Sequence, residues 1–133
     1  EQHGQNASTA EDMLNIARGH LELRRTAERE AGNLLIEDTD PVLTAIWSDI
    51  LAGYRDPWFD RFDDYPDLYL FCDIDLPWVR DSVRYFGDPE ARLRFHRACE
   101  RELVARNANF IRISGTAEQR LAQAIGAVEQ VLR

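Results

Sequence analysis

The chain has 133 residues, is 44% hydrophobic and carries a formal net charge of −8. These values are typical of a soluble globular chain with one domain or part of one. The negative net charge argues against nucleic acid as a partner, because such binding neutralises phosphates with basic side chains. A membrane helix is not expected either, because no apolar run approaches the roughly 20 residues it requires.

The first third of the chain predicts a helix followed by a strand. Residues 1–10 have no periodic pattern and are expected to be frayed. From Glu11, apolar residues recur at helical spacing until Gly32 and Asn33, which favour a helix end. The short apolar run that follows predicts a strand over Leu34–Glu37, buried on both faces.

The remaining elements continue this alternation. The pattern predicts a helix over 41–53, a loop or short helix over 55–66, a strand over 68–72, a helix over 88–106, a strand over 109–113 and a last helix from 116. No linker or repeat divides the chain, so residues 1–133 are expected to form one domain. Alternating helices and strands indicate an α/β fold with a parallel sheet.

Acidic residues follow two of the predicted strands. Asp38 and Asp40 come after the first strand, and Asp73 and Asp75 come after the second. Open α/β sheets bind their ligands at the carboxyl ends of the strands, so Asp38 and Asp40 predict a site for Mg²⁺ and a nucleotide. The alternative is that Asp40 or Thr39 only caps the helix that begins at Pro41.

Lysine and cysteine usage limits the possible chemistry. All 16 basic residues are arginine, and a Gly-rich phosphate loop ending in lysine is therefore absent from these 133 residues. Cys72 and Cys99 have no metal-binding spacing. Both are expected to be reduced, buried residues of a cytoplasmic protein.

Several motifs together resemble the NadR-like ribosylnicotinamide kinase domain, a P-loop kinase whose wider family includes AAA-type ATPases. The resemblance covers about residues 11–132, and its most specific parts are the Asp-Thr-Asp turn and the Pro-Trp-Val-x-Asp loop. The matching segments are Ile16–His20, Glu37–Asp40, Thr44 with Trp47, Asp67–Leu70, Pro77–Asp81 with Arg84, Ile113 with Gly115, and Arg120-Leu121.

The resemblance implies a P-loop kinase-like parallel sheet flanked by helices and an ATP- and Mg²⁺-dependent phosphoryl transfer in NAD biosynthesis. The acceptor would be a small nucleoside such as nicotinamide riboside. Family members begin with a strand and a Walker A loop, which these residues lack. We therefore expect a C-terminal part of the kinase domain, inactive alone. The alternatives are a non-catalytic regulatory or binding module and an unrelated α/β domain with solvated acidic strand ends.

The resemblance also assigns roles to single residues. Asp38 is the expected Walker B-type ligand of Mg²⁺, and Asp40 is a second catalytic candidate, for the metal or for the acceptor hydroxyl. Residues 77–106 are expected to form a lid-like region over ATP. Its arginines suit phosphate binding through their planar donors: Arg80, Arg84, Arg92 and Arg94, with Arg84 also expected to be catalytic. The alternative is a solvated helix whose arginines pair with neighbouring acids.

Aromatic side chains are candidates for binding the nucleoside. Trp47 and Trp78 could stack on a flat base, and Asp81 lies in the same loop as Trp78. Trp47 fits the inner stripe of its helix equally well, so core packing is its alternative role. Zinc is not expected, because no His or Cys spacing suits it.

Overall fold

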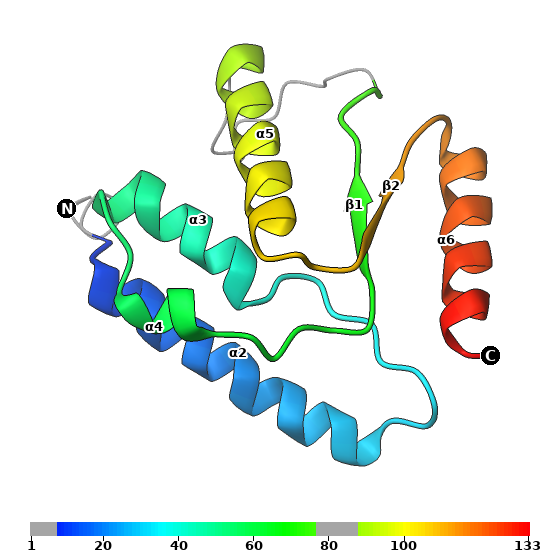
Figure 1. Ribbon diagram of the computed structural model, residues 1–133, viewed down its shortest axis with the longest axis horizontal. Coiled ribbons are helices and arrows are strands. Elements are labelled where there is room, and N and C mark those ends of the chain that lie inside the picture. The colour runs from blue at the N-terminus through cyan, green and yellow to red at the C-terminus, as the bar shows by residue number, and fades with distance from the viewer. Residues whose placement is uncertain (1–7, 77–87) are drawn as a thin grey trace, which may run out of the picture. The chain divides into compact units, whose positions relative to one another are not determined.

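A computed structural model describes residues 8–76 and 88–133 of the chain. These residues belong to two compact units, Glu1–Asp64 and Tyr65–Arg133, and each unit is described by itself. Figure 1 shows the elements of both. Across the described residues, no helix is long and apolar enough to cross a membrane.

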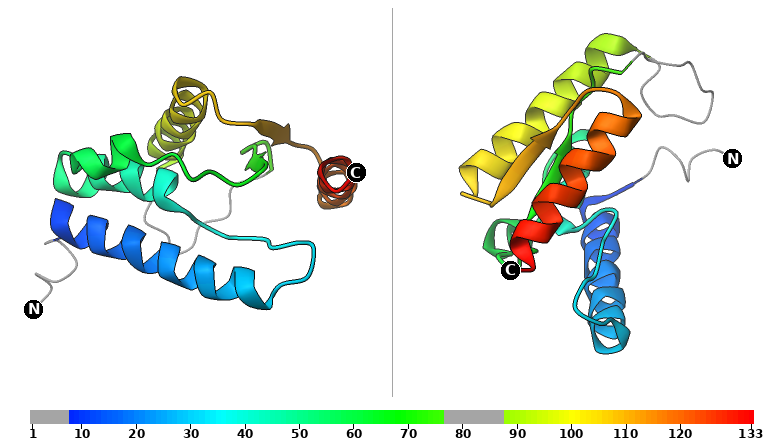
Figure 2. Two further views of the ribbon diagram at one scale, coloured as in Figure 1. Left: turned by 60° about the horizontal axis from the view of Figure 1, so that its bottom comes forward. Right: turned by 90° about the vertical axis from the view of Figure 1, so that its right-hand side faces the viewer.

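The first unit is helical. It contains α2 (Ala10–Glu30), α3 (Pro41–Ala52) and the short α4 (Pro57–Arg61). Figures 1 and 2 show α2 and α3 side by side and running in roughly opposite directions. Their contact forms a core around four buried residues, against which Trp47 and Trp58 also pack: Met13, Ala17, Ala45 and Phe59.

Local sequence signals explain the helix ends of this unit. Thr9 and Asp12 form a capping box at the start of α2, so the chain is already ordered there. The predicted frayed end, residues 1–10, is therefore too long at its C-terminal side. Residues 1–7 lie outside the described part. Asp40 caps α3 ahead of Pro41, and Gly53 ends α3 with a left-handed φ of 85°, a conformation that glycine adopts without steric cost.

The predicted strand over Leu34–Glu37 is wrong for the structure. Residues 34–37 form an irregular segment, with Leu34 45%, Leu35 37% and Ile36 74% exposed. A strand needs a neighbour to pair its backbone N–H and C=O groups, and no strand in the described part of the chain pairs with this segment. Its apolar side chains therefore lie at the surface of the first unit.

The second unit has an α/β architecture, as predicted. It contains β1 (Tyr69–Cys72), α5 (Pro89–Ala105), β2 (Phe110–Ile113) and α6 (Ala117–Val131). The strands are parallel, with Tyr69 opposite Phe110 and Cys72 opposite Ile113. Figures 1 and 2 show α5 and α6 on opposite sides of these strands, which is the covering that parallel strands require.

Burial in β1 differs from the prediction of a strand covered on both faces. Phe71 is buried at 9% exposure, whereas Leu70 is 37% exposed and Cys72 is exposed. Successive side chains of a strand point to opposite faces, so in β1 the Phe71 side chain is buried against His96 of α5, while those of Leu70 and Cys72 on the other face stay exposed. The expectation that both cysteines are buried is wrong for Cys72, while Cys99 on α5 is half-buried.

Candidate functional site

The acidic turn predicted to hold a metal lies between α2 and α3. Asp40 is 6% exposed, and its Oδ1 accepts hydrogen bonds from the backbone N–H groups of Val42 (3.1 Å) and Leu43 (3.4 Å). The Thr44 hydroxyl donates to the carbonyl oxygen of Asp40 at 3.2 Å. Asp40 is therefore the N-cap of α3, and any role in binding a metal or an acceptor hydroxyl would be additional.

Asp38 and Thr39 form the exposed part of this turn. Asp38 lies at the surface and makes no ion pair or side-chain hydrogen bond with another residue of the described segments. Thr39 has a φ of 91°, which is a genuine outlier for a β-branched residue. Such a conformation costs about 1–3 kcal/mol and persists only where neighbouring contacts impose it.

Glu37 is held by a residue that the sequence analysis did not single out. The Arg24 side chain is only 5% exposed, and its Nε lies 2.9 Å from Oε2 of Glu37. A signal for this contact is present in the sequence, because Arg24 occupies the same helix face as the buried Met13, Ala17 and Leu21. An arginine on an apolar face requires a buried partner.

The turn could hold a magnesium ion whose other ligands are mostly water and substrate phosphates. Within residues 8–76 and 88–133, no cluster of three His, Cys, Asp or Glu side chains could enclose a metal. Mg²⁺ commonly uses one or two carboxylates together with water and substrate phosphates. The exposed Asp38 carboxylate suits that arrangement, whereas a closed all-protein site is not formed there.

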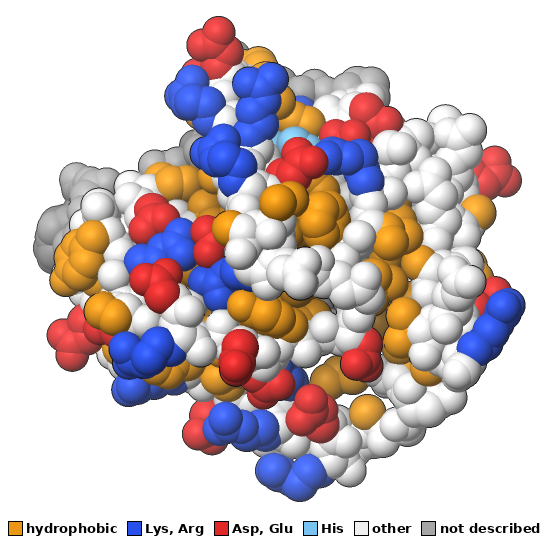
Figure 3. All heavy atoms as spheres, in the orientation of Figure 1, with side chains coloured by type: hydrophobic (Ala, Val, Ile, Leu, Met, Phe, Trp, Pro, Cys, Tyr) orange, Lys and Arg blue, Asp and Glu red, His pale blue; other side chains and the backbone are white. Residues whose placement is uncertain are grey.

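The predicted phosphate-binding arginines lie in the second unit or outside the described residues. Arg92 is half-buried and Arg94 exposed, both near the start of α5. Figure 3 shows arginine side chains gathered over α5. Arg80 and Arg84 fall within residues 77–87, outside the described part, so the predicted lid-like region is represented only by α5.

The aromatic candidates divide in the same way. Trp47 is half-buried and packs against the core of Met13, Ala17, Ala45 and Phe59, which is the alternative role that its helix position suggested. Trp78 and Asp81 lie outside the described residues. The roles of all three in binding substrate therefore remain predictions.

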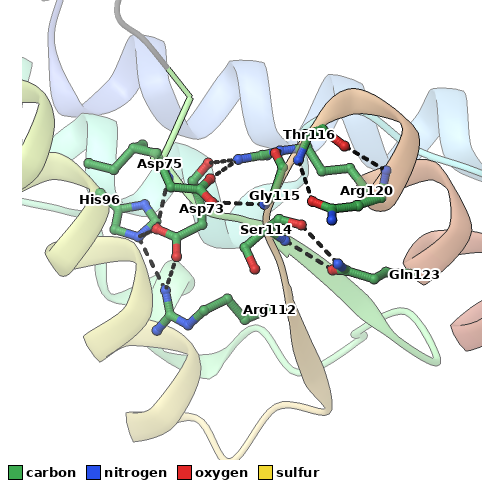
Figure 4. A network of polar contacts seen from close by, with 11 residues as sticks. Asp73, Asp75, His96, Arg112, Ser114, Gly115, Thr116, Arg120 and Gln123 are labelled. Carbon is green, nitrogen blue, oxygen red and sulfur yellow. Dashed lines mark hydrogen bonds and ion pairs between the residues drawn. The ribbon is translucent and has the colours of Figure 1, made fainter.

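A second polar cluster, which the sequence analysis missed, lies where β1 and β2 end. Figure 4 shows Asp73 beside His96 of α5 and Arg112 of β2. Oδ1 of Asp73 is 3.4 Å from Nε2 of His96, and its Oδ2 is 3.6 Å from Nη1 of Arg112. Arg112 also pairs with Glu100 of α5. The acidic end of the second predicted strand was the available signal, but its partners depend on the tertiary fold.

Burial sets the protonation of His96. Its ring stacks on Phe71 with centroids 4.5 Å apart, and the residue is 9% exposed. Desolvation lowers the pKa of His96, and Arg112 and Arg92 lower it further, against the opposing effects of Asp73 and Glu100. The neutral imidazole is favoured, and a neutral imidazole beside a carboxylate can accept a proton.

Asp75 ties the end of β1 to the start of α6. Its carboxylate accepts a hydrogen bond of 2.8 Å from the Gly115 N–H and pairs with Arg120. The Gly115 hydrogen bond is the largest cause that lowers the pKa of Asp75, and Arg120 adds to it. Gly115 has a φ of 100°, and a Cβ there would clash with Oε1 of Gln119. These contacts hold the loop after β2 in place.

Comparisons with known proteins identify a domain family and two curated relatives. A family model described as an AAA domain matches residues 1–120. The chain is 29% identical to the Trifunctional NAD biosynthesis/regulator protein NadR of Escherichia coli (strain K12), over 104 residues that cover 77% of this chain and 25% of that protein. The protein of the same name from Salmonella typhimurium (strain LT2) is 28% identical, with the same coverage. The chain thus spans about a quarter of the length of these relatives, and no solved structure matches it.

Proposed function

Because the chain belongs to the AAA domain family, we propose that it forms part of an enzyme that transfers a phosphoryl group from ATP to a small nucleoside. Nicotinamide riboside is the proposed acceptor. The relatives are named for NAD biosynthesis, and the motif resemblance is to ribosylnicotinamide kinases. Both support a proposed role in NAD biosynthesis.

The exposed carboxylate of Asp38 is the observation that carries this proposal. It projects from a turn whose two ends are fixed, at Glu37 by Arg24 and at Asp40 by the start of α3. When bound, Mg²⁺ neutralises charge that develops between the phosphates during transfer. Asp38 is the proposed ligand of this ion, and a fixed turn would present its oxygen without reorganisation.

The remaining residues have proposed roles around the same reaction. Asp40 contributes a second negative charge, for the metal or for orienting the acceptor hydroxyl. Arg84, together with Arg80, Arg92 and Arg94, would contact the phosphates. Trp47, Trp78 and Asp81 would contact the nucleoside. The 133 residues hold no Gly-Lys phosphate loop, so these residues account for only the metal and lid sides of a nucleotide site.

A kinase assay on the complete gene product tests this proposal. It should form ADP from ATP in the presence of Mg²⁺ and nicotinamide riboside, and little ADP when the nucleoside is omitted. Other ribonucleosides serve as comparison acceptors. Nucleotide binding without any acceptor-dependent ADP formation would contradict the proposal and favour a non-catalytic binding module.

A further inference from the structure

Arg24 is a buried charged residue that the proposed chemistry does not itself use. Its Nη1 donates a hydrogen bond of 2.7 Å to the carbonyl oxygen of Asp64, and its Nε faces Glu37. Nε and Nη2 are both buried and make no hydrogen bond in the described structure, so the contact of Nε with Glu37 is an ion pair. The guanidinium thus joins three segments of the first unit, because Arg24 lies on α2, Glu37 precedes the acidic turn and Asp64 follows α4.

Because the Arg24 guanidinium is buried, it depends on a carboxylate partner. An ionised side chain removed from water is strongly destabilising unless it is paired, and removal of one partner leaves the other charge uncompensated. The carboxyl group of Asp64 is 3.6 Å from Nη1 but 71% exposed, so solvent weakens its effect. Glu37, with a side chain 24% exposed, is the more buried carboxylate partner of Arg24.

The Arg24–Glu37 contact lies immediately before the strained part of the turn. Thr39 keeps its φ of 91° between Glu37 and Asp40. Asp40 is fixed by the N–H groups of Val42 and Leu43 at the start of α3. Arg24 supplies the matching restraint on the other side, so the two residues between these restraints, Asp38 and Thr39, have little freedom to relax.

We propose that Arg24 is a positioning residue, which holds Glu37 and thereby fixes the Asp38–Thr39 turn in the conformation that presents the Asp38 carboxylate to Mg²⁺. The kinetic part of this inference rests on the proposed function. Its structural part, the restraint of the turn by the Arg24–Glu37 pair, stands on the geometry of the first unit alone.

Two measurements on the complete gene product test the two parts separately. Hydrogen exchange at the Val42 and Leu43 amides, which donate to Oδ1 of Asp40 at the end of the turn, reports the restraint. The Mg²⁺ concentration for half-maximal rate reports the presentation of Asp38. In Arg24→Gln, exchange should become at least about ten-fold faster, since local opening loses a buried ion pair. The half-saturating Mg²⁺ concentration should rise by a similar factor, while the KM for nicotinamide riboside stays unchanged.

Matched variants separate positioning from general destabilisation. Arg25→Gln removes the neighbouring arginine, whose side chain is exposed, and should change neither measurement. Glu37→Gln should reproduce the effect of Arg24→Gln, and the double variant should be no worse than either single variant, because both remove one contact. Arg24→Lys keeps the charge and should restore part of the Mg²⁺ response, and it also serves if Arg24→Gln does not fold.

The outcomes are distinguishable. Unchanged exchange at the Val42 and Leu43 amides in folded Arg24→Gln or Glu37→Gln would overturn the restraint. Faster exchange with unchanged Mg²⁺ dependence would overturn the positioning role. Arg24 would then have only a structural role in holding the turn. If the wild-type protein shows no Mg²⁺-dependent turnover, the proposed function fails together with the positioning role, while the exchange measurement still decides the restraint.

Discussion

At the scale of single residues, His96 links the second unit to pH. Burial and the neighbouring Arg112 and Arg92 lower its pKa in the folded state below the ordinary 6.5. As the pH falls, the unfolded chain takes up this proton first, so the folded state loses stability as the pH drops below about 6.5. Above that pH, the contribution of His96 to stability is fully present.

Urea unfolding at pH 8 and pH 5.5 measures this effect. We expect a lower free energy of unfolding at pH 5.5, and a smaller difference between the two pH values in His96→Gln. Asp75 does not affect this comparison. Its pKa is lowered in the folded state, so its contribution to stability is lost only as the pH falls below the ordinary 3.8. An equal pH dependence in wild type and His96→Gln would contradict the role of His96.

At the scale of elements, the segment before α3 and strand β2 offer a direct contrast. Ile36 is 74% exposed in the irregular segment, whereas Ile113 is 2% exposed at the end of β2. Ile113→Ala should lower the free energy of unfolding by about 2–5 kcal/mol, because it empties a buried site. Ile36→Ala should change it by no more than about 0.5 kcal/mol, as for other surface positions.

Chemical denaturation of the two variants decides between an exposed segment and a buried strand at residues 34–37. A loss for Ile36→Ala comparable to that for Ile113→Ala would show that residue 36 is buried after all. Such a result would return this segment to the strand that its apolar composition predicts.

The helix boundaries were predictable because their signals are local. The pairs Asp40-Pro41 and Asp88-Pro89 and the Thr116–Gln119 capping box each mark a helix start within a few residues, and all three are confirmed. The irregular backbone of residues 34–37 was not predictable from their apolar composition. An apolar run indicates burial only if another strand supplies backbone partners, and that condition is set elsewhere in the chain.

In the candidate site, too, the local feature was predictable and the long-range contacts were not. The Asp38–Asp40 turn could be located in the sequence because carboxylates directly follow an apolar run. The contacts of Glu37 with Arg24 and of Asp73 with His96 and Arg112 join residues far apart in the chain. The sequence indicates that Arg24 and Asp73 need partners but does not identify them, so the restraint on the turn became visible only in the structure.

At the scale of the whole molecule, the chain distributes its candidate chemistry over two units. The carboxylates of the proposed metal site belong to the first unit, whereas Arg92 and Arg94 belong to the second. The chain spans about a quarter of the length of its NadR relatives. The first unit therefore supplies one component of the proposed nucleotide site, the exposed carboxylate of Asp38.

The most direct test compares Asp38→Asn with Asp63→Asn in the complete gene product. Both variants remove one negative charge from an exposed residue of the first unit, but only Asp38 is a proposed ligand of Mg²⁺. With saturating ATP and nicotinamide riboside, Asp38→Asn should lower kcat by about 100-fold or more, comparable to the loss of a key electrostatic group, whereas Asp63→Asn should leave it unchanged. Wild-type kcat and Mg²⁺ dependence in folded Asp38→Asn would contradict the account.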